Sequence, residues 1–91
     1  MYNIYLMYRY SKHIVTRMQE RDFSEAEIIT LLDRKAKVVV AQSFRDPQVD
    51  VYLGEVGGKY IALFINREDK ILITIRPMRP KEKKYYEETI K

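Results

Sequence analysis

The stretch Lys59-Tyr60-Ile61-Ala62-Leu63-Phe64-Ile65 (residues 59–65) decides the fold, because apolar side chains fall on both of its faces when it is extended. A strand with one face in solvent alternates apolar and polar residues, since successive side chains point to opposite faces of the sheet. Residues 59–65 do not alternate in this way. We therefore expect a central strand that is covered on each side.

Segments on either side of this stretch are typical of neighbouring strands. Gly57-Gly58 directly precedes it and tolerates the positive φ angles of a two-residue hairpin turn. Residues 49–53 and 71–76 alternate apolar and other side chains, and Pro77 ends the second of these segments. Residues 37–44, which contain three consecutive valines, and residues 2–8, which are rich in Tyr and Ile, predict two further strands.

Helix signals fall in three places. Ser11 is a candidate N-cap for a helix over residues 12–21, and Ser24 with Glu27 forms a capping box that opens a second helix. Pro80 is suited to the first turn of a last helix that ends near Thr89.

The order β-α-α-β-β-β-β-α predicts one α+β domain over residues 1–91. We expect a twisted antiparallel sheet of about four strands, with two N-terminal helices and one C-terminal helix. A chain of 91 residues is one domain's worth, and its 46% hydrophobic content is enough for a small core.

Composition excludes several classes of chemistry. The chain has no cysteine and one histidine, which excludes disulfides, thiolate metal sites, cysteine nucleophiles and His-rich zinc sites. We expect no metal and no cofactor. The apolar run over residues 60–65 is too short to span a bilayer, and no basic segment precedes an apolar one at the N-terminus, so we expect a cytoplasmic protein without a membrane partner.

Charge is unevenly distributed along the chain. Lys and Arg number 17 against 13 Asp and Glu, a net charge of 17 − 13 = +4. Residues 76–91 hold six basic and three acidic residues, and residues 9–21 hold four basic residues and one acid. Two basic segments around a nearly neutral centre favour a polyanionic partner, although solvated surface charge explains the same balance.

His13 is the only side chain that ordinarily titrates near neutral pH. At 100° per residue Arg17 and Arg21 lie on the same stripe of the first predicted helix. An imidazole beside two guanidiniums suits phosphate chemistry, in which arginines hold the phosphate and the imidazole moves a proton. The alternative is that His13 packs at a helix start while the arginines extend into solvent.

A second constellation follows the last strand. Arg76 lies at the end of the last strand, where a rigid backbone holds its side chain. Glu82 and Tyr86 lie one turn apart on the last helix. An arginine, a carboxylate and a phenol can together polarise a phosphodiester. They can equally form an Arg–Glu pair that docks the helix, with the tyrosine as packing.

The segment 54–88 resembles the C-terminal half of the BrnT-like toxins of toxin–antitoxin pairs, through a glycine-bearing hairpin, an apolar strand, the strand end Ile73-Thr74-Ile75-Arg76 and a charged helix with Glu82 and Tyr86 or Tyr85. The N-terminal half resembles a related group of small proteins with a Ser-x-His motif, matched by Ser11-Lys12-His13, and a helix opening Ser24-Glu25-Ala26-Glu27. BrnT-like toxins carry Lys-His-Gly before the second helix, where this chain has Glu20-Arg21-Asp22. The resemblance implies a RelE-like fold, metal-independent RNA cleavage and a cognate antitoxin.

The leading hypothesis is a metal-independent endoribonuclease toxin in which the RNA 2′-hydroxyl attacks the adjacent phosphorus, cleaving the chain and leaving a cyclic phosphate. It assigns catalysis to His13, Arg17, Arg76 and Tyr86, and a structural or catalytic role to Glu82. The nucleic-acid-binding residues it expects are Arg21, Arg79, Lys81, Lys83 and Lys84.

Two other hypotheses remain open at this point. The chain could be a non-catalytic nucleic-acid-binding or regulatory module that uses the same basic faces, or a module that binds an acidic protein. The expected partners are RNA and an antitoxin protein, and we also consider a homodimer. The ribonuclease hypothesis requires His13 and Arg76 to share one pocket.

Overall fold

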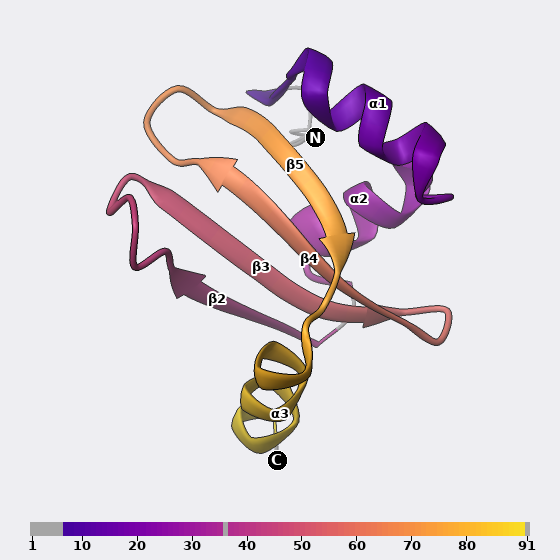
Figure 1. Cartoon of the computed structure of the whole chain (residues 1–91), viewed down its shortest axis with the longest axis vertical. Helices are drawn as coiled ribbons and strands as arrows, with labels where there is room; N and C mark the ends of the chain where they lie inside the picture. The colour runs from indigo at the N-terminus through magenta and orange to yellow at the C-terminus, as the bar shows by residue number, and fades with distance from the viewer. Residues whose placement is uncertain (1–6, 36, 91) are drawn as a thin grey trace.

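The central strand expected at residues 59–65 forms as β4 (Lys59–Asn66), in the middle of a five-stranded sheet with the order β1-β5-β4-β3-β2 (Figure 1). This computed structural model describes residues 7–35 and 37–90. The other elements are β1 (Arg9–Tyr10), α1 (Lys12–Glu20), α2 (Glu25–Leu32), β2 (Val38–Gln42), β3 (Val49–Val56), β5 (Ile71–Pro77) and α3 (Pro80–Thr89). The protein is α+β.

The sheet is mixed, which corrects the expectation of about four antiparallel strands. Strands β2 to β5 pair antiparallel through short turns, whereas β1 pairs parallel to β5 through Arg9↔Ile71 and Tyr10↔Leu72. Alternation in a sequence carries no information about the direction of a distant partner, so it could not reveal this pair. Most of the strand expected at residues 2–8 lies outside the described residues, and Met7 and Tyr8 are not in a strand.

Strand β4 contributes to two separate cores. Ile61, Leu63 and Ile65 are almost completely buried against α1 and α2, together with Ile14 and Ile28. The intervening residues face the other side of the sheet. Ala62 lies there in a second core whose other buried members are Val39, Val51, Leu53 and Tyr86.

The helices are therefore divided between the two faces of the sheet. Helices α1 and α2 cover one face, and α3 packs on the other through Tyr86, as the separation of α3 from α1 and α2 in Figure 1 illustrates. A strand that is apolar on both sides requires such a division, because each face must be removed from water.

A β-bulge in β5 changes which side chains reach the α1 side. The pairing passes from Phe64↔Thr74 to Ile65↔Leu72, so Ile73 has no partner in the register. As a result Leu72 and Ile75 are fully buried beneath α1, instead of the regular alternation of Ile71, Ile73 and Ile75 expected from the sequence.

The bulge also anchors α1. The Ser11 hydroxyl donates to the Ile73 carbonyl at 2.8 Å and accepts from the Ile14 N–H at 3.0 Å. One side chain thus caps the helix, as predicted, and fixes its start to the edge of β5.

The Gly54→Ala variant tests the contact between β3 and α2. A Cβ at residue 54 would lie 2.5 Å from Leu31 Cδ2, and Leu31 is fully buried. We expect a loss of about 1–3 kcal/mol in the free energy of unfolding, measured by urea denaturation, because the core is overpacked. Gly57→Asn is the control, since residue 57 has φ +58° and open space around it, and it should change stability little. Equal stability of the Gly54 variant and the parent would contradict this packing.

Candidate nucleic-acid interface

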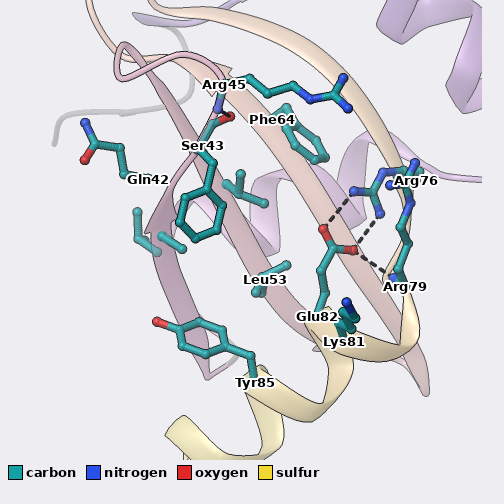
Figure 2. Close-up of a pocket in the computed structure, with 14 residues that line it drawn as sticks. Gln42, Ser43, Arg45, Leu53, Phe64, Arg76, Arg79, Lys81, Glu82 and Tyr85 are labelled. Atoms are coloured by element: carbon teal, nitrogen blue, oxygen red, sulfur yellow. Dashed lines mark hydrogen bonds and ion pairs between the residues drawn. The ribbon is translucent and has the colours of Figure 1, made fainter.

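A groove lies on the α3 face of the sheet, with a volume of about 960 Å³. Strand β2 and the loop after it form one wall, α3 and the end of β5 form the other, and Val51, Leu53 and Phe64 contribute to its apolar lining (Figure 2). The charged residues that line it are Arg45, Arg76, Arg79, Lys81 and Glu82. Four positive charges and one negative charge give the groove a net charge of 4 − 1 = +3.

Arg76 and Glu82 form a bidentate ion pair in this groove. Arg76 Nη1 lies 2.6 Å from Glu82 Oε1, and Nη2 lies 2.7 Å from Oε2. The guanidinium carbon also stands 4.9 Å from the centroid of the Phe64 ring, within cation–π range. The hydrogen bond from Arg76 is the main cause that holds the pKa of the Glu82 carboxyl below its usual value.

The backbone positions this pair. Arg76 pairs with Ala62 in the sheet, so its side chain emerges on the α3 face. Pro80 occupies the first turn of α3, and Glu82 Oε1 accepts the Arg79 N–H at 2.8 Å as part of the helix cap. The strand end and the helix start are therefore joined by one carboxylate.

The loop after β2 supplies two groove residues that the sequence analysis missed. The Phe44 side chain is completely exposed, and Arg45 extends along one end of the groove in Figure 2. An exposed aromatic residue costs free energy in water unless something covers it, so Phe44 is a candidate stacking surface. The available signal was the position of Phe44-Arg45 directly before the Asp46-Pro47 turn, because connecting segments run over the protein surface.

Tyr86, which we expected to act in catalysis, is buried. It is 2% exposed, and its hydroxyl donates to the Lys37 carbonyl at 2.7 Å. Burial raises the pKa of this phenol. The neighbouring Tyr85 is 48% exposed and lines the groove, so Tyr85 is the tyrosine that a ligand can reach.

Lys83 and Lys84 lie outside the groove. They line a shallow depression on α3 together with Pro80, Glu87 and Glu88. The Lys83 ammonium lies 4.2 Å from the centroid of the Tyr60 ring, so a cation–π contact with Tyr60 accounts for the position of this side chain. Of the five expected nucleic-acid-binding residues, only Arg79 and Lys81 line the groove.

His13 and Arg17 lie on α1 and Arg21 is its C-cap, and this helix packs on the other face of the sheet. Arg17 Nε donates to His13 Nε2 at 3.2 Å and Arg17 Nη1 pairs with Glu20 at 3.0 Å, while Arg21 donates to the Ile75 carbonyl at 3.3 Å. None of the three lines the groove that contains Arg76. The requirement that His13 and Arg76 share one pocket is therefore not met.

Within residues 7–35 and 37–90, no three His, Cys, Asp or Glu side chains come together as a set of metal ligands. In the same part of the chain, no helix combines the length and apolar character needed to cross a membrane.

Comparison of the chain with protein-family models, with curated proteins and with solved structures found no match. The groove is therefore interpreted from its own residues.

The structural assignment of Tyr86 predicts that Tyr86→Phe lowers the free energy of unfolding by about 0.5–1.5 kcal/mol, because one hydrogen bond to a backbone carbonyl is lost. Urea denaturation measures this loss, and Tyr85→Phe, which alters an exposed ring, is the matched control with no expected change. If the free energy of unfolding of Tyr86→Phe equalled that of the parent, the structural role of the Tyr86 hydroxyl would be contradicted.

The lowered pKa values of Glu82 and Asp50, which result first from hydrogen bonds to Arg76 and Arg67, predict acid sensitivity. A carboxyl with a lower pKa in the folded state binds fewer protons there, so its stabilising contribution is present above its unfolded pKa, about 4. That contribution is lost as the pH falls through the folded pKa. Urea denaturation at pH 7, 5 and 3 should show a smaller acid loss for Glu82→Gln than for the parent, and equal losses would contradict the ion pair.

Proposed function

We propose that the protein binds single-stranded RNA in the groove between α3 and the β2–β3–β4 surface, as a non-catalytic module. One observation carries the proposal: four cations and two exposed aromatic rings, Phe44 and Tyr85, line a single groove. Cationic grooves follow a phosphate backbone, and exposed rings stack on unpaired bases.

The division of charge within the groove supports this proposal. Arg45, Arg79 and Lys81 form no ion pair with any described residue, whereas Arg76 is paired with Glu82. Three unpaired cations can each replace a counterion on a phosphate. Duplex ends and interiors offer few free base faces to Phe44 and Tyr85, which favours an unpaired strand.

An endoribonuclease toxin of the RelE-like and BrnT-like kind is the second candidate, and one observation favours it. Glu82 holds an ionised carboxylate beside Arg76 in the same groove, so a base and a cation for the phosphorane charge stand side by side. In this form, cleavage takes place without His13.

The binding module ranks first for a chemical reason. Proton transfer near neutral pH works best with a group whose pKa is near that pH, and the pKa of Glu82 is held below its usual value instead. His13, the only histidine of the chain, lies on α1 outside the groove.

Fluorescence anisotropy with a labelled 12-residue oligouridylate tests the proposal. Three phosphate contacts predict a slope of about −2 for log K against log salt concentration, since each contributes about −0.7 on a single strand. Arg45→Gln and Lys81→Gln should each make the slope less steep by about 0.7, and Phe44→Ala should weaken binding about fivefold or more through the lost base stack.

Lys12→Gln and His13→Ala, which alter exposed residues of α1, are the controls and should bind like the parent. Oligothymidylate and a duplex of the same length distinguish RNA from other nucleic acids. Binding that is lost in the α1 variants but kept in the groove variants would refute the groove. Cleavage of total RNA in the presence of EDTA, abolished by Arg76→Gln and kept by His13→Ala, would establish the second candidate instead.

A further inference from the structure

Arg76 differs from the other groove cations because it already has a carboxylate partner. Both of its terminal nitrogens contact the two oxygens of Glu82, at 2.6 and 2.7 Å, and Nη1 also donates to the Pro77 carbonyl at 3.1 Å. Among the described residues, Arg45, Arg79 and Lys81 have no such anion. One of the four positive charges of the groove is thus neutralised by a carboxylate of the same chain.

The Glu82 carboxylate holds Arg76 in the geometry that a phosphate would use. A guanidinium fork donates to carboxylate and phosphate oxygens in the same bidentate arrangement. The Arg76 side chain is 18% exposed and that of Glu82 is 26% exposed, and both line the groove, so solvent and a ligand reach the pair from the open side. The guanidinium also contacts the Phe64 ring through a cation–π interaction, which keeps Arg76 in place when its ion-pair partner changes.

We propose that Arg76 is a latent phosphate-binding site that Glu82 keeps closed, and that a backbone phosphate of the bound strand replaces Glu82 when the site opens. The proposal rests on the nucleic-acid-binding function of the groove. It assigns Glu82 the role of an internal competitor, which sets the affinity of the groove below the value that its four cations could supply.

Helix α3 does not depend on the Arg76–Glu82 pair alone for its position. Tyr86 anchors the helix through its buried ring, its hydrogen bond to the Lys37 carbonyl and an edge-to-face contact with Tyr60 at 6.2 Å. The pair can therefore exchange partners while α3 stays on the sheet. A glutamine at residue 82 also preserves the cap, because Glu and Gln both serve at the third helical position of a capping box.

The test is a double-mutant cycle of Glu82→Gln and Arg76→Gln, with binding of the oligouridylate measured by anisotropy. Glu82→Gln should tighten binding about tenfold and steepen the salt slope from about −2 to about −2.8, because one charge-assisted contact is added. Glu88→Gln, which removes an exposed acid of α3 outside the groove, is the matched control for the change in net charge and should stay within about twofold of the parent.

The cycle distinguishes a closed site from an open one. Arg76→Gln should have little effect in the parent and should cancel the gain in the Glu82→Gln background. Two results would refute the role of Glu82 as an internal competitor while leaving the groove function in place. One is that Arg76→Gln weakens binding by the parent as much as it weakens binding by Glu82→Gln. The other is that Glu82→Gln binds no tighter than Glu88→Gln. If none of the proteins binds the oligonucleotide, the groove function itself is refuted.

A second measurement covers the case in which Glu82→Gln folds poorly. The Nε–Hε resonance of Arg76 in the parent protein is followed by NMR during titration with the oligouridylate and, separately, with inorganic phosphate. Replacement of Glu82 predicts a shift of this resonance that saturates together with the anisotropy signal. A resonance that stays unchanged at saturation would overturn the proposal, and a response to inorganic phosphate alone would show that the site takes free phosphate and not the strand.

Discussion

The double-sided burial of β4 is the constraint on which the rest of the structure depends. Ile61, Leu63 and Ile65 enter one core and Ala62 enters another, so neither face of the sheet can be left in water. The chain meets this constraint by placing α1 and α2 on one face and α3 on the other. Because the two hairpins that flank β4 are short, the helices cannot exchange faces without reversing the alternation of every strand.

This division also determines which charged residues can cooperate. The basic residues of segment 76–81 lie on the α3 face together with Arg45, whereas His13 and Arg17 lie on α1. Two basic segments that look equivalent in the sequence therefore have different surroundings. On α1 the charges are engaged with one another and with β5, and on the α3 face they border an apolar floor with two exposed rings. Only the second surface combines charge with stacking area, and Glu82 pairs with one of its cations.

Much of the fold could be predicted because it depends on local signals. The Ser11 N-cap, the Ser24–Glu27 capping box, the Gly57-Gly58 turn and the apolar character of residues 59–65 act within a few residues. The corresponding helices and strands form where the sequence indicates. The parallel pair of β1 with β5 and the bulge at Ile73 depend on contacts between distant segments, so alternation alone could not reveal them. For the site, the proximity of Arg76 and Glu82 was predictable from six residues of separation. The burial of Tyr86 was not, since it depends on which face of the sheet α3 covers.

We propose that nucleic acid binds the α3 face of the sheet and not the α1 face. Chemical-shift mapping of the ¹⁵N-labelled protein during titration with the oligouridylate tests it most directly, because it reports on every position at once. Binding in the groove predicts saturable changes at Phe44, Arg45, Arg79 and Tyr85, with His13 and Arg17 unaffected. Changes confined to α1, with the loop after β2 and the start of α3 silent, would contradict it.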